Sequence, residues 1–301
     1  MKVLLIGSTG QLGTTLLNTK PANIDLLTPN KKEFNLLNPQ SCFNSILNIK
    51  PDWVINAGAY TKVDIAEIEK KDCFLINSTS VESIAKGLEK TGGKLLQIST
   101  DFVFNGKQGH PYKPNQKTLP INYYGFSKAE GEKHIIKILK NKNQSIILRT
   151  SWLMSDFGSN FLLTILKLHN NKSSFPVVAD QVGCPTSTYS LSKTCWDILL
   201  YDTKIHKTCL PGIMHWTDAG VATWFDLAYS IGEIGKEIGL INKNADLIPI
   251  KSSEYETKAT RPKYSVLDSS LSRDLLNLGH LNWRRTIYEI MIKLSKKAGA
   301  L

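Results

Sequence analysis

Short apolar runs alternate with segments of helical periodicity through the first half of the chain. The apolar runs are Val3–Ile6, Ile24–Leu27, Trp53–Ile55, Leu95–Ile98 and Ile146–Leu148. Between them, apolar residues recur at the spacing of one helix face in Cys42–Ile49, Val81–Leu88 and Ala129–Leu139. Strands that alternate with helices predict βαβ units with right-handed crossovers. We therefore predict an α/β protein with a doubly wound parallel sheet of the Rossmann type, whose ligands bind at the carboxyl ends of the strands.

The second half of the chain has a different pattern. After residue 150 the alternation weakens, and turn-rich pairs such as Pro211-Gly212 and Arg261-Pro262 appear. We expect residues 1–150 to form a dinucleotide-binding domain. Residues 151–301 should form mainly a smaller, C-terminal substrate-binding region that is partly interleaved with the first domain.

Composition and charge exclude several classes of protein. Hydrophobic residues make up 42% of the 301 residues and charged residues 21%, as in ordinary globular proteins. No apolar run is long enough to span a bilayer, and the opening run stops at Gly7, too early for a signal peptide. The net charge of +11 comes from dispersed lysines without a nucleic-acid-binding motif. We expect no nucleic-acid partner and no membrane partner, although such a surface would attract a small anion such as a nucleotide diphosphate.

The cysteines and histidines bear on metal binding and on the compartment. The five cysteines are scattered and include no C-x-x-C pair, which argues against a disulfide framework and against a zinc site. The six histidines are isolated, so catalytic zinc is not expected either. We predict a cytoplasmic protein without a bound metal.

A glycine-rich turn, Gly7-Ser8-Thr9-Gly10-Gln11-Leu12-Gly13, directly follows the first predicted strand. Glycines at this place permit a tight turn and let the backbone approach a pyrophosphate, which then lies at the N-terminus of the next helix. The spacing is the G-x-x-G-x-x-G of short-chain enzymes rather than the G-x-G-x-x-G of typical dehydrogenases. We predict that this turn binds a nicotinamide dinucleotide.

The end of the second predicted strand bears on which dinucleotide binds. An acidic residue there would bind the adenosine ribose hydroxyls and favour NAD. The strand ends instead at Leu27-Thr28-Pro29-Asn30, followed by Lys31 and Lys32, two cations that could hold a 2′-phosphate. We expect NADPH as the cofactor, with NADH as the alternative.

Tyr124 and Lys128 stand four residues apart, so they share one face of a helix. A phenol has a reference pKa of about 10, and a neighbouring ammonium favours phenolate and lowers that pKa. Tyr124 would then serve as proton donor and acceptor, and Lys128 could also hold the nicotinamide ribose. Thr100, in the Ser99-Thr100-Asp101 after the fourth predicted strand, could donate a hydrogen bond to the substrate oxygen. We predict Tyr124, Lys128 and Thr100 as the catalytic residues.

Further motifs extend over nearly the whole chain. Together with the glycine turn and the Tyr/Lys pair, they are Pro51–Thr61, Val63–Glu67, Ser99–Phe104, Gly131-Glu132, Arg149–Trp152, Asn160-Phe161, Asp180–Thr186 and Arg261-Pro262. With this set the chain resembles the dTDP-4-dehydrorhamnose reductase family, within the extended short-chain dehydrogenases. The set is specific, because ordinary short-chain reductases share only the glycine turn and the Tyr/Lys pair.

The resemblance implies roles for individual residues. The implied cofactor-binding residues are Gly7, Gly10, Gln11, Leu12, Gly13, Asn35, Leu36, Ala57, Ala59, Tyr60, Thr61, Tyr124 and Lys128. The implied substrate-binding residues are Thr100, Asp101, Trp152 and Arg261. Within these sets, residues 10–12 should lie against the pyrophosphate, residues 35 and 36 at the adenine, and residues 59–61 near the nicotinamide. Arg261 would suit the diphosphate of a sugar nucleotide, because an arginine fork matches phosphate oxygens.

The resemblance also implies the reaction. The protein would reduce the C4 keto group of dTDP-4-dehydro-L-rhamnose to dTDP-L-rhamnose by hydride transfer from NAD(P)H, for surface polysaccharide synthesis. Its partner would be a dTDP-linked keto sugar, and a homodimer stays open. Some relatives join subunits through magnesium bound to a glutamate of the first helix. Thr14-Thr15 stands there in this chain, so we predict no such metal.

Two alternatives stay open at this point. One is a reductase or epimerase that acts on another nucleotide-linked sugar. The other is a non-catalytic NADP-binding regulatory subunit resembling the β subunit of methionine adenosyltransferase, which shares this fold and parts of these motifs.

Aromatic residues outside the motifs have a simpler interpretation. Trp224, Phe225 and Tyr229 lie in a segment of helical pattern and are predicted to be core. His215-Trp216 is predicted to pack within the smaller C-terminal region.

Overall fold

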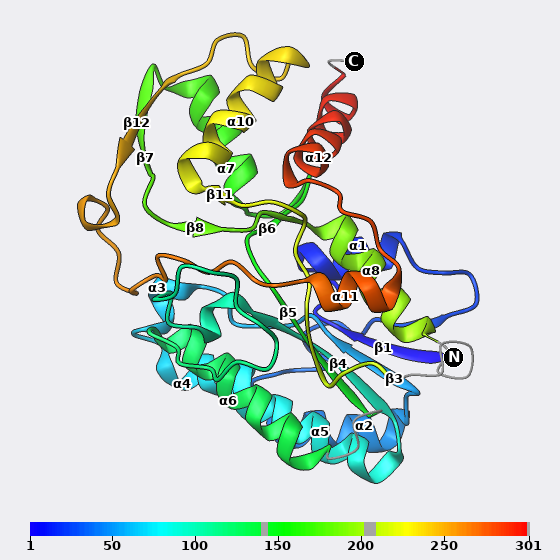
Figure 1. Ribbon diagram of the computed structural model, residues 1–301. Coiled ribbons are helices and arrows are strands. Elements are labelled where there is room, and N and C mark those ends of the chain that lie inside the picture. Colours follow the sequence, from blue (N-terminus) through cyan, green and yellow to red (C-terminus); the bar gives the residue numbers. More distant parts are fainter. Residues whose placement is uncertain (140–143, 202–208, 300–301) are drawn as a thin grey trace.

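A six-stranded parallel sheet forms the centre of the protein. The computed structural model describes residues 1–139, 144–201 and 209–299. The sheet has the strand order β10-β5-β4-β3-β1-β2, and every neighbouring pair is parallel (Figure 1). Its strands are β1 (Lys2–Ile6), β2 (Asp25–Leu27), β3 (Trp53–Asn56), β4 (Lys94–Thr100), β5 (Ser145–Thr150) and β10 (Ile213–His215). The predicted Rossmann-type α/β fold is confirmed, and each apolar run of the first half contains or overlaps a strand.

Alternate residues of a strand face opposite sides of the sheet, and each side buries its own core. Val3 and Leu5 pack with α1 and α8, whereas Leu4 packs with α2, α5 and α6. The bounds of these helices are α1 (Gln11–Asn18), α2 (Pro39–Ile49), α5 (Ser80–Thr91), α6 (Tyr123–Ile138) and α8 (Thr188–Leu200). Figure 1 shows the two groups on opposite faces of the sheet. Strands covered on both faces need apolar residues on both, which explains continuous apolar runs such as Val3–Ile6.

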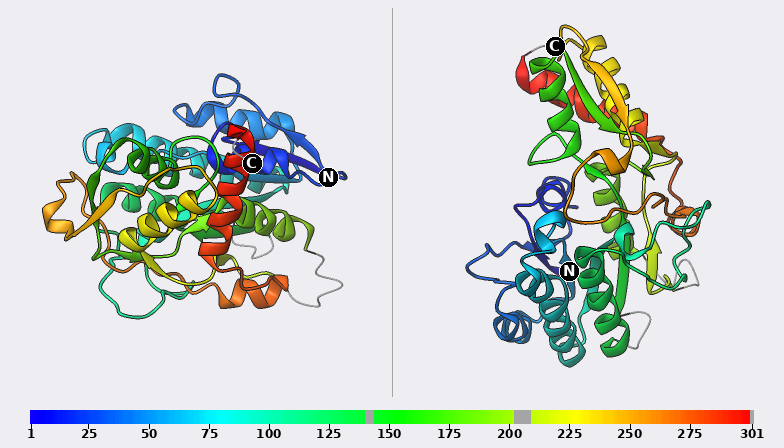
Figure 2. Two further views of the ribbon diagram at one scale, coloured as in Figure 1. Left: turned by 90° about the horizontal axis from the view of Figure 1, so that it is seen from above. Right: turned by 90° about the vertical axis from the view of Figure 1, so that its left-hand side faces the viewer.

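A second, smaller region stands beside the central sheet and carries the C-terminus (Figure 2). Its core is formed largely by α7 (Phe161–Asn171), α10 (Trp224–Glu237) and α12 (Trp283–Ala298). Its two-stranded sheets pair β7 (Ser174–Val178) with β12 (Asp246–Ile250), β8 (Val182–Gly183) with β11 (Ala222–Thr223), and β6 (Leu153–Met154) with β9 (Thr186–Ser187). The second half of the chain also supplies β10, α8 and α11 (Ser270–Leu276) to the central sheet. The domain boundary at residue 150 stays a prediction.

Short helices and turns complete the described part of the chain. They are α3 (Val63–Ala66), α4 (Lys70–Phe74), the π-helical turn η1 (Leu75–Thr79) and the 3-10 turns η2 (Asp101–Val103) and η3 (Ser252–Glu254). Across residues 1–139, 144–201 and 209–299, no helix has both the length and the apolar character needed to cross a membrane.

The winding of the chain reverses at β1. From β1 the chain passes to β2 on one side and then to β3 on the other, so β1 lies between them in the sheet. The connections that leave in opposite directions open a crevice at the carboxyl ends of β1 and β3, where sheets of this kind bind ligands.

A buried ion pair fastens α6 to the sheet. Arg149 of β5 donates to both carboxylate oxygens of Glu132 at 2.9 and 2.6 Å, and the two side chains are 2% and 3% exposed. Ser99 of β4 donates to the same carboxylate at 2.5 Å. His215 lies against Arg149, with 3.3 Å between Nε2 and Nη1, so it packs on the central sheet and the prediction that it packs in the smaller region is wrong. Burial, together with Arg149, lowers the pKa of His215 to about 3 and keeps the imidazole neutral.

Replacing Glu132 by alanine should destabilise the protein by about 3–5 kcal/mol, because Arg149 would be left as an unpaired buried charge. The matched control is Glu289→Ala, which removes an exposed pair with Arg285 and should cost less than about 1 kcal/mol. Urea unfolding followed by circular dichroism measures both losses. Equal losses would contradict an anchoring role for Glu132.

Candidate active site

Most of the predicted site residues line one cavity at the carboxyl ends of the strands. The cavity has a volume of about 620 Å³ and lies between the central sheet and the smaller region. The predicted residues in its lining are Gly7, Gly10, Gln11, Leu12, Ala57, Ala59, Thr61, Thr100, Asp101, Tyr124, Lys128, Trp152 and Arg261. They come from both halves of the chain, and the strand order brings them together.

The turn between β1 and α1 presents backbone donors to this cavity. Gly10 is the N-cap residue of α1, and no side chain caps the helix, so its first N–H groups have no side-chain acceptor. Gly7 has a left-handed φ of 81°, and a Cβ there would lie 2.5 Å from the nitrogen of Gly58. A Cβ at Gly13 would lie 2.0 Å from the Gly7 carbonyl oxygen. An uncapped helix N-terminus reached over glycines suits a phosphate group, so the residues present fit the pyrophosphate of a dinucleotide.

Four predicted cofactor residues lie outside the lining of this cavity: Gly13, Asn35, Leu36 and Tyr60. Asn35 closes its own turn by accepting a hydrogen bond from the Leu37 N–H at 3.0 Å. The carbonyl of Leu36 accepts from the Ser80 hydroxyl. Their part in cofactor binding stays a prediction.

The segment Ala59–Thr61 is held by a side chain outside the motifs. Asn77, in the π-helical turn η1, accepts from the Tyr60 N–H at 2.9 Å and donates to the Tyr60 carbonyl at 3.0 Å. The same amide donates to Ser127 Oγ of α6 at 3.0 Å, while the Tyr60 hydroxyl turns away to Glu69. π-helical turns are frequent at functional sites. Asn77 thus joins this segment to the helix that carries the predicted catalytic pair.

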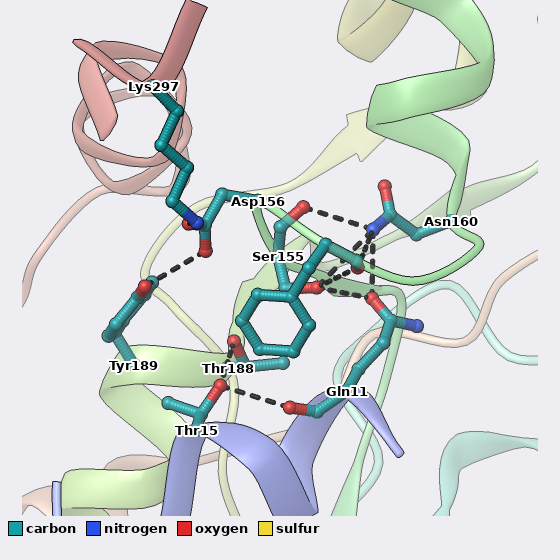
Figure 3. Close-up of polar contacts among 9 residues, drawn as sticks. Gln11, Thr15, Ser155, Asp156, Asn160, Thr188, Tyr189 and Lys297 are labelled. Carbon is teal, nitrogen blue, oxygen red and sulfur yellow. Dashed lines mark hydrogen bonds and ion pairs between the residues drawn. The ribbon is translucent and has the colours of Figure 1, made fainter. Parts of the chain in front are cut away.

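Gln11 links the glycine turn to the smaller region (Figure 3). Its Oε1 accepts from Ser155 Oγ at 2.8 Å and from Asn160 Nδ2 at 2.9 Å, and its Nε2 donates to the Ser159 carbonyl at 3.3 Å. Asn160 also caps α7, because its Oδ1 accepts from the Leu163 N–H at 3.0 Å. The Gln11 side chain is therefore taken up by contacts between two walls of the cavity, and the predicted pyrophosphate contact would fall to its backbone.

The loop that carries Ser155 is anchored from its other side as well. Asp156 accepts from Lys297 of α12 at 2.5 Å and from the Tyr189 hydroxyl of α8 at 2.9 Å (Figure 3). The Asp156 side chain is 1% exposed. The loop is therefore held by Gln11 on one side and by Lys297 and Tyr189 on the other.

Thr100, Tyr124 and Lys128 meet at the end of β4. Thr100 is its last residue, Tyr124 lies in the first turn of α6, and Lys128 follows one turn later. Lys128 is buried and donates to the Ile98 carbonyl at 2.6 Å. The Tyr124 ring packs edge-on against Phe102, with 5.9 Å between the ring centroids. The three predicted catalytic residues share one cavity, and their roles stay predictions.

The electrostatics of this pair differ from the expectation. Burial raises the pKa of Tyr124, the Thr100 hydrogen bond opposes the rise, and the charge of Asp101 adds to it. Burial lowers the pKa of Lys128 to about 8, and Glu132 opposes that fall. The expected lowering of the phenol pKa is therefore wrong, because the loss of water around the ring outweighs the one interaction that lowers the pKa, the Thr100 hydrogen bond. A phenol with a raised pKa is protonated at neutral pH and can act as an acid.

Two stacked tryptophans form part of the cavity wall. Trp152 has a φ of 44° and stacks on Trp224, with 3.5 Å between ring centroids and 5° between ring planes. A left-handed backbone at a bulky residue is strained and is typical of functional sites. The prediction that Tyr229 is core is wrong, because it is 54% exposed. Trp224 packs against the core of the smaller region and also lines the cavity. Phe225 packs against the core of the smaller region.

A second cavity of about 640 Å³ adjoins the first. Phe161, Trp224 and Arg261 line both cavities. Arg261 donates to both carboxylate oxygens of Asp64 in α3, at 3.1 and 2.6 Å. The guanidinium thus lies where the cavities meet, which suits an anionic group that reaches from one into the other.

The described residues contain no group of three or more His, Cys, Asp or Glu side chains that could hold a metal ion. All five cysteines are free, and four of them are buried.

Known proteins match this chain over nearly its whole length. A family model described as the RmlD substrate binding domain matches residues 1–296. The dTDP-4-dehydrorhamnose reductase of Aggregatibacter actinomycetemcomitans is 32% identical over 96% of this chain and 98% of its own. The chain belongs to the dTDP-4-dehydrorhamnose reductase family. The resemblance inferred from the motifs is confirmed.

Other members of the family agree with this assignment. The spore coat polysaccharide biosynthesis protein SpsK of Bacillus subtilis is 34% identical over 96% of both chains. The crystal structure of the dTDP-4-dehydrorhamnose reductase from Bacillus anthracis in complex with NADP has a TM-score of 0.85 at 32% identity. The match covers 97% of this chain and 99% of that one.

Several residues that line the cavity, or that hold a residue of its lining or of the neighbouring segment, were not among the predicted site residues. Asp64 and Asn160 lie inside two of the motifs that mark the family, so a usable signal was present for them. Asn77 and Trp224 lie in helical segments whose pattern does not distinguish them from ordinary core positions.

Substitution of Gly183 by alanine should disturb the tryptophan stack. A Cβ there would lie 2.5 Å from Cε2 of Trp152, so the indole must move away from Trp224. We expect a changed near-UV circular dichroism spectrum and a loss of about 1–3 kcal/mol from overpacking. The control is Gly212→Ala, whose Cβ would meet only the Ser145 carbonyl oxygen at 3.9 Å. Identical spectra for the two variants would show that the indole does not depend on space at residue 183.

Proposed function

We propose that this protein reduces the C4 keto group of dTDP-4-dehydro-L-rhamnose to dTDP-L-rhamnose, for surface polysaccharide synthesis. The observation that carries the proposal is the convergence of Thr100, Tyr124 and Lys128 in the cavity that the glycine turn also lines. Membership of the family supports it, as does the Bacillus anthracis relative crystallised with NADP. NADPH is the proposed cofactor, and NADH remains the alternative.

The geometry of the cavity supports a set of residues that would hold the cofactor. The uncapped N-terminus of α1, with Gly10 and Leu12, would receive the pyrophosphate, and Thr61 lies in the wall near the catalytic pair. Lys128 would hold the nicotinamide ribose. When bound, the cofactor supplies the hydride that reduces the carbonyl carbon.

Tyr124 would donate a proton to the substrate oxygen as negative charge develops there. Its raised pKa keeps the phenol protonated at neutral pH, so the donor is present before the reaction begins. Thr100 would donate a hydrogen bond to the same oxygen, in a site from which water is largely excluded. Lys128, fixed on the Ile98 carbonyl, would place its charge beside the phenolate that forms.

The two adjoining cavities suit a substrate with two ends. The keto sugar would lie beside Tyr124 in the first cavity and the nucleoside in the second, with the diphosphate between them at Arg261. Arg261 can offer a fork of two N–H donors to phosphate oxygens. We also propose that the protein works in the cytoplasm, which its free cysteines support. A homodimer remains open.

Substitution of Tyr124 by phenylalanine should lower kcat by about 10²–10⁴-fold, because the ring keeps its packing and loses only the acidic proton. NADPH binding, followed by nucleotide fluorescence, should be retained. The matched control is Tyr123→Phe. The Tyr123 ring lies under Lys70 and outside the cavity lining, so this variant should keep the turnover of the wild type. Undiminished turnover by the Tyr124 variant would remove the proposed acid.

The same assay separates the alternatives. Consumption of NADPH with dTDP-, UDP- and GDP-linked 4-keto sugars identifies the nucleotide that the second cavity accepts. A regulatory subunit would instead bind NADPH, turn over none of these sugars and co-purify with a synthetase.

A further inference from the structure

Asp101 is a buried acid that forms no ion pair with any residue in the described part of the chain. It follows Thr100 directly at the end of β4, and its residue is 2% exposed. Its Oδ1 accepts from Thr100 Oγ1 at 3.1 Å, whereas Oδ2 is buried without a hydrogen bond of normal geometry in the described part of the chain. No salt bridge reaches it from residues 1–139, 144–201 or 209–299. An ionised carboxylate in such a place is costly, which favours the protonated acid.

The groups that face Asp101 come from several elements. Tyr124 of α6 and Cys184, between β8 and β9, are the titratable ones, and both interact with its charge. The hydroxyls of Thr100 and Ser265 stabilise its charged form. Burial outweighs them and raises the pKa of Asp101 to about 7, so both forms of the acid are populated near neutral pH.

Thr100 connects this acid to Tyr124. Its Oγ1 accepts from the Phe102 N–H at 3.2 Å and lies 3.1 Å from Asp101 Oδ1. Thr100 and Tyr124 line the same cavity, and the Thr100 hydroxyl lowers the pKa of Tyr124, as a group able to donate to the phenolate does. A hydroxyl has one proton to donate and two lone pairs to accept with. With Asp101 protonated, Thr100 can accept from Asp101 and from Phe102 while it donates to Tyr124. All hydrogen-bonding capacity of Thr100 is then used.

The proposed reduction leaves Tyr124 as a phenolate that must recover a proton before the next turnover. We propose that Asp101 is the acid that restores the Tyr124 phenol, through the hydroxyl of Thr100. The O–H bond of Asp101 breaks as its proton passes to Thr100 Oγ1. The original Thr100 proton passes to the Tyr124 oxygen, so that a carboxylate and a phenol result. Asp101 takes up a proton again after product leaves, and no oxidant or reductant is needed.

A role in holding Thr100 in position would not by itself explain why residue 101 is an acid. An asparagine of nearly the same shape could accept from Thr100 without the cost of a buried titratable group. The raised pKa of Tyr124 also makes proton transfer from Asp101 to the phenolate favourable.

The first test is the pH dependence of kcat. This inference rests on the proposed reduction, so the wild type is measured with NADPH and the dTDP-linked keto sugar. Its kcat should fall as the pH rises through about 7, because Asp101 then loses its proton. Asp101→Asn should lower kcat about tenfold or more at low pH and abolish that fall. Thr100→Val, which removes the connecting hydroxyl, should abolish it too.

Ser265→Ala gives the matched control. The Ser265 hydroxyl lowers the pKa of Asp101, so its removal should move the fall in kcat to higher pH and leave a plateau below it. A substitution that only loosened the packing would lower kcat equally at all pH values. Nucleotide binding by each variant shows that it is folded.

The second test needs no turnover. Infrared difference spectra of the free protein, wild type against Asp101→Asn, should show a protonated carboxyl that ionises near pH 7. A carboxylate already ionised at pH values well below neutral would overturn the relay. The relay would also be overturned if the wild type is active and the Asp101→Asn variant shows the same fall in kcat with rising pH. A wild type without turnover contradicts the proposed function instead, and the infrared titration still decides the state of Asp101.

Discussion

The buried carboxylate of Glu132 is the interaction on which the site depends. It binds Arg149 of β5 through both oxygens and accepts from Ser99 of β4 at 2.5 Å. Ser99 directly precedes Thr100, and Glu132 lies one helical turn beyond Lys128. A single anion therefore fixes the end of β4 and the rotation of α6 relative to each other. Burying the Glu132 carboxylate costs free energy, but without it Arg149, itself inaccessible to water, would be an unpaired buried charge.

This arrangement buries Thr100 and Lys128, and it leaves Tyr124 partly buried in the cavity lining. Burial moves each group towards its neutral form: it raises the pKa values of Tyr124 and Asp101 and lowers that of Lys128. The same exclusion of water strengthens each hydrogen bond to a charge that forms on the substrate.

The sequence predicts the central sheet well, because helices cover both faces of the sheet. A strand segment such as Val3–Ile6 is buried on both faces, so it appears as an uninterrupted apolar run. The edge strand β10 was not predicted, because Ile213–His215 is short and its histidine is placed by Arg149, which is distant in the chain. Local patterns carry no signal for such a contact.

The sequence likewise predicts only part of the candidate site. The spacing of Tyr124 and Lys128 predicts that they are neighbours, and they do lie in one cavity. Spacing does not predict how much water surrounds them, and for that reason the direction of the Tyr124 pKa shift was missed. Periodicity likewise places Trp224 on an apolar helix face, but a core position and a cavity wall are both apolar. Only the tertiary structure tells them apart.

The contacts across the cavity differ in strength, and the difference indicates which of them a ligand can replace. Asp156 is almost inaccessible and accepts from both Lys297 and Tyr189, so two helices hold its loop. The side chains of Arg261 and Asp64 are 24% and 38% exposed, so water screens this pair more than it screens the buried pair of Arg149 and Glu132. A phosphate can offer the guanidinium two oxygens, as the Asp64 carboxylate does. The proposed substrate would therefore replace Asp64 at Arg261 while the smaller region stays attached to the sheet through its buried contacts.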